Sequence, residues 1–244
     1  MGVLGVRRIV TGDNGALLAA FDLDGTLLDS AGQIVERVIA CWEACGFPPP
    51  DPMLARRIIG LPWKESVLAL LPDAGPEEFE KIRRYYDDVR EGRRAAPPPT
   101  ETLFDGARAT LEALRGRGYA LAIVTSRTGD RLEALLRDHG IDDFFLACKT
   151  ADMGPSKPDP FLLRQAMDDA GAGPATTVMI GDTTFDIGMA VNAGTHAVGV
   201  SWGVHEVDEL RAAGAHRIAE SFGEVRDAAV AMTGGAAGPA RRPE

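Results

Sequence analysis

The stretch LLAAFDLDGTLLDS, Leu17–Ser30, opens with a continuous apolar run that ends at Asp22. An apolar run of this length, bounded by turn residues, is typical of a strand that is buried on both faces. The turn DGT follows at Asp24, and after Ser30 the pattern changes to an amphipathic helix with Ser30 as its expected N-cap. The stretch therefore predicts a buried strand whose carboxyl end carries two aspartates.

The sequence that follows Ser30 predicts only helices up to a proline-rich segment. The helical patterns cover Ile34–Gly46, Pro52–Ile59, Trp63–Leu71 and Pro76–Arg90. The segment AAPPPT, residues 95–100, then forms a stiff linker. We therefore predict an all-helical cap over residues 31–100, inserted directly after the first strand and its turn.

From Asp105 onward, helical patterns alternate with apolar strands. The predicted strands are Tyr119–Ser126, Phe144–Lys149, Thr176–Asp182, His196–Trp202 and an edge strand at His216–Glu220. Such alternation indicates a parallel sheet. The predicted fold class is α/β, with a Rossmann-like parallel sheet covered by helices on both faces and the inserted helical cap. Residues 17–30 and 101–232 would form this discontinuous α/β core, after an N-terminal extension (1–16) and before a disordered tail (233–244).

Composition limits the classes of partner. The chain has 244 residues, 45% hydrophobic and 25% charged, with a formal net charge of −10. This acidity argues against a nucleic-acid surface but allows a small anionic ligand, because only the local field of a pocket matters. Three cysteines without zinc-type spacing fit a reducing compartment, and no apolar run approaches the roughly 20 residues of a membrane span. We therefore expect a cytoplasmic protein, monomeric or homodimeric, that binds neither nucleic acid nor membrane.

Polar clusters lie at or near the ends of the predicted strands, where open parallel sheets bind ligands. The clusters contain Asp22 and Asp24 in FDLDGTLLDS, Thr125 and Ser126 in VTSR, Lys157 in PSKPDP, and Asp182 and Asp186 in IGDTTFD. A carboxylate such as Asp22 can attack phosphorus and form an aspartyl-phosphate. Carboxylates at Asp22 and Asp182 suit Mg²⁺, while Lys157 can neutralise the transferring oxygens. Asp24 lies close enough along the chain to act as general acid and base.

Taken in this order, the clusters resemble those of the haloacid dehalogenase (HAD) superfamily, and the insertion resembles its subfamily with a helical cap. The resemblance covers about residues 17–220. It implies a Mg²⁺-dependent phosphatase with Asp22 as nucleophile and metal ligand. Asp24 would be the acid/base and would give the metal its backbone carbonyl. The resemblance further implies Thr125, Ser126, Lys157 and Gly25 as phosphoryl-binding residues, Asp182 as a metal ligand and Asp186 as its support.

Two longer segments look most similar to phosphoglycolate phosphatase-like members of the family. They are IIGLPWKES in the predicted cap and GDTTFDIGMAVNAGTHAVGVSWG near the end of the core. The expected substrate is therefore a small phosphorylated metabolite of the phosphoglycolate kind. Lys64 would then bind substrate from the cap, beside Leu61, Pro62 and Trp63; otherwise Trp63 packs between helices and Lys64 is solvated. Trp202 and His205 follow a strand end and are candidates for the border of the entrance.

Other functions use the same residue types. A phosphomutase would return the phosphoryl group to a sugar instead of to water, and Asp24 would serve either reaction. A receiver-like signalling module, which is not an enzyme, also carries an acidic pair, an aspartate and a lysine at strand ends, but that class generally lacks a large helical cap. A carbon–halogen hydrolase is disfavoured because it needs neither the second aspartate nor a metal.

Overall fold

A computed structural model describes residues 15–95, 100–129 and 132–234. Its centre is a six-stranded sheet in the order β5-β4-β1-β6-β7-β8, and every neighbouring pair is parallel. The strands are β1 (Ala16–Phe21), β4 (Tyr119–Val124), β5 (Ala147–Lys149), β6 (Ala172–Gly181), β7 (His196–Val200) and β8 (Arg217–Ala219). The predicted parallel α/β sheet is confirmed, with the first strand at its centre and the last at an edge.

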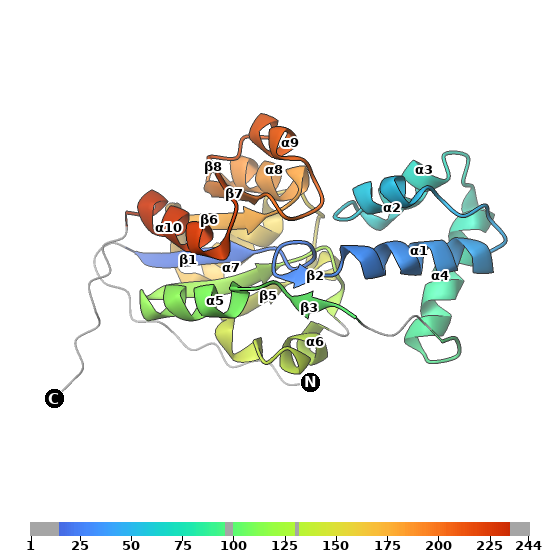
Figure 1. Cartoon of the computed structure of the whole chain (residues 1–244), viewed down its shortest axis with the longest axis horizontal. Coiled ribbons are helices and arrows are strands. Elements are labelled where there is room, and N and C mark those ends of the chain that lie inside the picture. Colours follow the sequence, from blue (N-terminus) through green and yellow to red (C-terminus); the bar gives the residue numbers. More distant parts are fainter. Residues whose placement is uncertain (1–14, 96–99, 130–131, 235–244) are drawn as a thin grey trace.

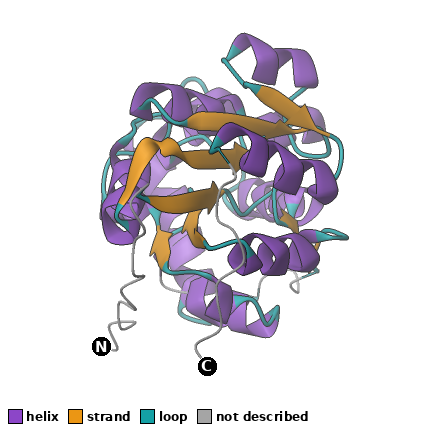
Figure 2. Cartoon of the chain, turned by 90° about the vertical axis from the view of Figure 1, so that its left-hand side faces the viewer, coloured by secondary structure: helices purple, strands orange, loops and turns teal. Residues whose placement is uncertain are grey.

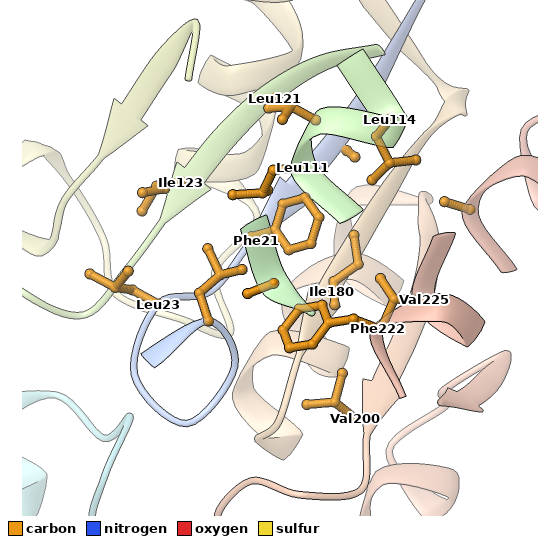
Figure 3. Packing of buried hydrophobic residues seen from close by; sticks show 14 of the residues in the cluster. Phe21, Leu23, Leu111, Leu114, Leu121, Ile123, Ile180, Val200, Phe222 and Val225 are labelled. Carbon is orange, nitrogen blue, oxygen red and sulfur yellow. The ribbon is translucent and has the colours of Figure 1, made fainter. Parts of the chain in front are cut away.

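Helices cover both faces of this sheet, as Figure 2 shows from the side. On β1, Ala19 and Phe21 belong to one hydrophobic cluster, while Leu18 and Ala20 belong to the other. This alternation follows from the period of two along a strand. The Phe21 side packs against α5 (Ala107–Gly116), α6 (Leu132–Asp138) and α10 (Phe222–Met232), and part of this packing is drawn in Figure 3. The Leu18 side packs against α7 (Phe161–Ala170), α8 (Thr184–Ala193) and α9 (Val207–Ala212).

Residues 31–90, which follow β1 and its turn, form a separate helical body at one end of the sheet (Figure 1). Its helices are α1 (Ala31–Ala44), α2 (Pro52–Arg57), α3 (Trp63–Leu70) and α4 (Pro76–Arg90). They share a hydrophobic cluster of their own, centred on Val38, Trp42, Val67 and Ile82. A short antiparallel ribbon of β2 (Leu28–Asp29) and β3 (Thr102–Leu103) brings the two connections of this body together. The exact domain boundaries given above stay predictions.

The structure also contains elements that the sequence patterns did not predict. These are the ribbon β2–β3, the helices α9 and α10, and two 3₁₀ turns at Asp142–Phe144 and Ala151–Met153. Ser30 occupies the N-cap position of α1, but its side chain makes no capping hydrogen bond. The predictions for residues 1–14, for most of the proline linker (96–99) and for most of the tail (235–244) lie outside the described residues. Within the described part of the chain, no helix is both long and apolar enough to cross a bilayer.

Candidate active site

Three neighbouring strands deliver polar side chains to one edge of the sheet. Asp22 follows β1, Thr125 follows β4, and Asp182 follows β6, and these strands lie side by side in the order β4-β1-β6. The Asp22 N–H donates to the carbonyl of Ile180 (2.9 Å), which extends the β1–β6 ladder up to the aspartate. Residues that are 57 to 160 positions apart in sequence therefore meet at the carboxyl ends of the strands, as expected for an open parallel sheet.

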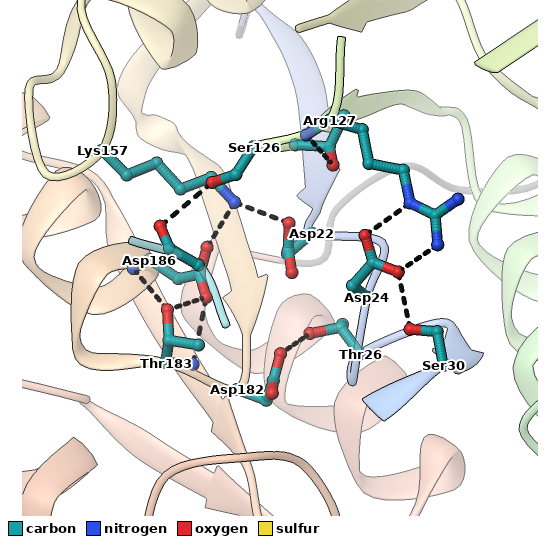
Figure 4. Close-up of polar contacts among 12 residues, drawn as sticks. Asp22, Asp24, Thr26, Ser30, Ser126, Arg127, Lys157, Asp182, Thr183 and Asp186 are labelled. Atoms are coloured by element: carbon teal, nitrogen blue, oxygen red, sulfur yellow. Dashed lines mark hydrogen bonds and ion pairs between the residues drawn. The ribbon is translucent and has the colours of Figure 1, made fainter. Parts of the chain in front are cut away.

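Lys157 joins two of the aspartates (Figure 4). Its Nζ donates to Asp22 Oδ1 and to Asp186 Oδ1, both at 2.6 Å, and the lysine is buried. The other oxygen of Asp186 accepts from the N–H (3.0 Å) and the hydroxyl (2.6 Å) of Thr183, which forms a capping box at the start of α8. Asp186 is thus held from both sides, and through Lys157 it fixes one oxygen of Asp22.

Asp182 is oriented by the DGT turn and by the loop after β7. Its Oδ1 accepts from the Thr26 hydroxyl (2.7 Å) and its Oδ2 from the Val204 N–H (2.8 Å). Gly25 has φ +80°, and a Cβ there would lie 2.3 Å from Asp182 Oδ2. Only glycine fits this position without strain, because it tolerates positive φ and leaves room for the carboxylate. The structure therefore places Gly25 against Asp182 as the turn residue.

The electrostatics of this cluster fit a divalent cation. Oxygens of Asp22, Asp182 and Asp186 all lie within 4.8 Å of one another, and all three residues are buried. Burial raises the pKa of Asp22 well above its usual value although Lys157 acts to lower it. Burial, followed by the charge of Asp186, raises the pKa of Asp182 to about 7. One lysine facing three buried carboxylates leaves an excess of negative charge, which a cation with oxygen ligands would neutralise.

Asp24 lies in a different environment from its neighbour Asp22. Its Oδ2 accepts from Arg127 Nε (2.6 Å), and its Oδ1 accepts from Arg127 Nη2 (2.5 Å) and from the Ser30 hydroxyl (2.6 Å). Burial alone would raise the pKa of Asp24. The charge and hydrogen bonds of Arg127, together with the Ser30 bond, outweigh burial and lower it. Arg127 also forms an ion pair with Glu101 (2.7 Å), so the acid/base candidate is held as a carboxylate between the two connections to the cap.

The phosphoryl-binding candidates Thr125 and Ser126 lie beside this pair. Thr125 is buried, and its hydroxyl accepts from the N–H of Arg127 (3.1 Å). The hydroxyl of Ser126 donates to the carbonyl of Gly60 in the cap (3.1 Å). Both residues line a cavity of about 260 Å³ that also contains Asp22 and Asp24. The strand-end residues predicted from the sequence thus surround a space large enough for a small ligand.

The cap residues divide into those that reach this space and those that do not. Leu61 and Trp63 line the cavity, and Trp63 packs edge-on against Phe79 at 5.2 Å between ring centroids. Pro62 is the N-cap of α3. Lys64 is exposed on the first turn of α3 and is absent from the described residues that line the cavity. The structure therefore does not bring Lys64 into the candidate site.

Trp202 and His205, which follow β7, make hydrogen bonds that support the site and do not line the cavity described above. The indole N–H of Trp202 donates to the carbonyl of Thr26 (3.2 Å) and so fixes the DGT turn. His205 is buried, and its Nδ1 accepts from the N–H of Thr184 at the start of α8 (3.1 Å). Sequence reasoning missed Arg127, Glu101 and Thr26 as site residues. The available signals were the position of Arg127, two residues after Thr125 in the VTSR cluster, and that of Thr26 in the DGT turn.

Comparisons with known proteins agree with this geometry. Residues 19–200 match the model of the haloacid dehalogenase-like hydrolase family. A probable phosphatase of Dickeya dadantii, IndB, is 39% identical over 220 residues, which cover 88% of this chain and 94% of that protein. A phosphoglycolate phosphatase of Vibrio vulnificus is 30% identical over 221 residues, covering 86% and 94%. A solved haloacid dehalogenase-like hydrolase from Bacteroides fragilis superimposes with a TM-score of 0.78 at 29% identity, covering 86% and 99%.

Proposed function

This chain belongs to the haloacid dehalogenase-like hydrolase family and is a phosphatase, and we propose that it hydrolyses a small phosphomonoester through an aspartyl-phosphate on Asp22, with Mg²⁺ as cofactor. The observation that carries the proposal is the position of Asp22. This buried carboxylate ends the central strand, has one oxygen on Lys157 (2.6 Å), and lines the cavity that Thr125 and Asp24 also line.

The residues of the chain supply each function that the reaction needs. Thr125, Ser126 and Lys157 would bind the phosphoryl oxygens as donors. A carboxylate oxygen of Asp22 attacks phosphorus, and the P–O bond to the leaving alcohol breaks while Asp24 gives that oxygen a proton. In the second half, Asp24 takes a proton from water, the water oxygen attacks phosphorus, and the P–O bond to Asp22 breaks to release phosphate.

The donor set also defines a place for the cofactor. Mg²⁺ would be held by the carboxylates of Asp22 and Asp182 and the backbone carbonyl of Asp24, with Asp186 in support. When bound, it would supply the positive charge that reduces repulsion between the attacking carboxylate and the anionic phosphoryl group.

The substrate class is proposed from a relative and from the size of the cavity. The name of the Vibrio vulnificus relative supports a phosphoglycolate-like compound, and the cavity volume suits a small metabolite. The acidic net charge still favours a partner other than nucleic acid. A cytoplasmic location and a monomeric or homodimeric state stay predictions.

The test is release of inorganic phosphate from a panel of phosphomonoesters, with Mg²⁺ or with EDTA. Asp22→Asn is expected to abolish turnover. Asp29→Asn is the matched control, because Asp29 lies in the same motif but is exposed on β2. Full activity of Asp22→Asn or activity in metal-free buffer would contradict the proposal. Isomerised product without phosphate release would indicate a mutase, and phosphate retained on Asp22 without turnover would indicate a receiver-like module.

A further inference from the structure

A second cavity adjoins the first one on the cap side of Asp24. It measures about 570 Å³ and lies between the core residues Asp24, Ser126 and Arg127 and the cap helices α1 and α4. Among the described residues, four arginines line it: Arg37, Arg83, Arg90 and Arg127. The two cavities share Ile34, Val38, Trp63 and Tyr86, so an apolar wall connects them.

Three of these arginines already have carboxylate partners. Arg83 pairs with Glu80 (2.5 Å), Arg90 pairs with Asp87 (2.5 Å), and Arg127 pairs with Asp24 and Glu101. The cation of each pair is therefore largely neutralised within the protein. Neither of the two cap pairs requires a ligand.

Arg37 on α1 differs from the other three. Its Nε is buried and has no hydrogen-bond partner, and the described residues provide no ion pair for its guanidinium. Leaving a buried donor without a partner is unfavourable, more so for a charged group. Within the described residues, the cavity beside the candidate nucleophile thus contains a cation, Arg37, that no carboxylate neutralises.

We propose that Arg37 is a specificity residue that binds a second anionic group of the substrate, a carboxylate or a second phosphate, while the phosphoryl group to be hydrolysed sits at Asp22. The inference rests on the proposed function. A guanidinium suits this task because its fork of N–H groups matches the two oxygens of a carboxylate or phosphate. The carbon skeleton between the two anionic groups would lie along the wall formed by Ile34, Val38 and Trp63. A neutral leaving group would leave Arg37 without a partner.

The test compares three substrates with aliphatic leaving alcohols. 2-Hydroxyethyl phosphate has no charged group besides the phosphate, phosphoglycolate adds a carboxylate, and ethylene glycol bisphosphate adds a second phosphate. The wild-type enzyme is expected to prefer at least one compound with a second anionic group over 2-hydroxyethyl phosphate. The expected preference is roughly tenfold to a hundredfold in kcat/KM, the usual range for a hydrogen bond to a charged group. The preferred compound distinguishes a carboxylate from a phosphate.

Variants then assign the preference to Arg37. Arg37→Gln is expected to lower kcat/KM for the preferred compound, mainly through KM, by much more than for 2-hydroxyethyl phosphate, and Arg37→Lys is expected to keep part of the preference. Arg84→Gln is the matched control, because Arg84 lies on α4 with its side chain 72% exposed and does not line the cavity. Equal losses of Arg37→Gln on all three substrates, or no preference in the wild type, would overturn the inference.

The two proposals fail in different ways. Hydrolysis of 2-hydroxyethyl phosphate that depends on Asp22 supports the proposed function whatever Arg37 does. Binding of the same three compounds to Asp22→Asn protein, measured by calorimetry, tests Arg37 without any turnover. Tighter binding of phosphoglycolate or of the bisphosphate than of 2-hydroxyethyl phosphate supports the inference if the difference is lost in Asp22→Asn/Arg37→Gln. Equal binding of all three compounds refutes it.

Discussion

Asp24 has to carry a proton when it acts as an acid, yet Arg127 and Ser30 hold it as a carboxylate in this structure. The same contacts suit the second half-reaction, in which Asp24 accepts a proton from water. To protonate a leaving alcohol, Asp24 has to move out of the ion pair or has to take up a proton within it. Ser30, which bonds Asp24, and Glu101, which pairs with Arg127, lie at the two connections to the cap. A cap movement would therefore change the contacts of both Asp24 and Arg127.

Replacing Arg127 with Gln should therefore change the protonation of Asp24. Because Arg127 lowers the pKa of Asp24, its loss should raise that pKa. Asp24 must be protonated in the half-reaction that kcat/KM reports, so the alkaline limb of the kcat/KM profile should move to higher pH. Arg127→Lys keeps the charge and should move the limb less. The limb is assigned through Asp24→Asn, which should lower kcat by about 10² to 10⁴-fold. An unchanged limb in Arg127→Gln would show that this ion pair does not control Asp24.

The raised pKa of Asp182 predicts that metal binding depends on pH. Its pKa in the folded protein, about 7, lies above the usual aspartate value of 3.8, because the group is buried and faces Asp186. The stability contributed by the protonated group is therefore present at low pH and is lost as pH rises through about 7 in the metal-free protein. Mg²⁺ requires the ionised form, so its binding should strengthen over the same interval.

The increase in Tm on adding Mg²⁺ should accordingly be larger at pH 8 than at pH 5, and Asp182→Asn should reduce it at both values. Differential scanning fluorimetry with and without the metal measures this. The shift is expected because a ligand that binds only the native state stabilises it. A Tm increase that is equal at both pH values, or unaffected by Asp182→Asn, would exclude Asp182 from the metal site.

The aspartates of the site could be predicted, but most of their partners could not. Asp22 and Asp182 each end an apolar run, and the order of runs and helices indicates which strand ends meet. The pairing of Arg127 with Asp24 spans 103 positions, and that of Thr26 with Asp182 spans 156. No periodicity links such residues, because their contact depends on side-chain directions that are set only when the loops pack.

The DGT turn is the element on which the geometry of the site depends. Gly25 there has φ +80° and contacts the Asp182 carboxylate, whereas Gly32, seven residues later, is exposed on α1 with open space around it. Gly25→Ala should destabilise the protein by about 1 to 3 kcal/mol, since a side chain at positive φ is strained and the added Cβ displaces the carboxylate. Gly32→Ala should be neutral or should stabilise by about 0.4 to 1 kcal/mol.

Urea unfolding measures both changes, and Mg²⁺ titration of the folded Gly25→Ala protein shows whether the displaced carboxylate also weakens metal binding. If the two alanine variants were equally stable, the turn would not be under the steric constraint that the structure indicates.

Elements with a long periodic pattern were predictable, and short ones were not. The helix predicted at Pro76–Arg90 is observed over the same residues, because fifteen positions give a clear amphipathic pattern. The ribbon β2–β3 has two residues in each strand, too few to show any alternation. It forms because residues 28–29 and 102–103, which flank the cap, are brought together by the fold.

At the scale of the whole molecule, the cap contacts the core at separate points beside the candidate site. Ser126 donates to Gly60, Arg56 donates to the carbonyl of Gly203 (2.7 Å), and Arg57 pairs with Glu209 on α9 (2.5 Å). In Figure 1 the loop after α2 points from the cap toward the sheet. Gly60 and Ser126 both line the cavity that Asp22 also lines, so this cap contact borders the candidate site.

The Arg57–Glu209 pair allows cap docking to be changed without touching the cavity. Both side chains are partly exposed, and exposed ion pairs contribute little to stability, so Arg57→Glu should leave Tm almost unchanged. It places two carboxylates together at the cap–core contact, however, and should lower kcat/KM severalfold by disfavouring the docked cap. Arg57→Glu/Glu209→Arg restores an ion pair of reversed polarity and should recover the activity. A double variant that stays as impaired as Arg57→Glu would show that Arg57 acts through some contact other than Glu209, and that docking at this point does not depend on the ion pair.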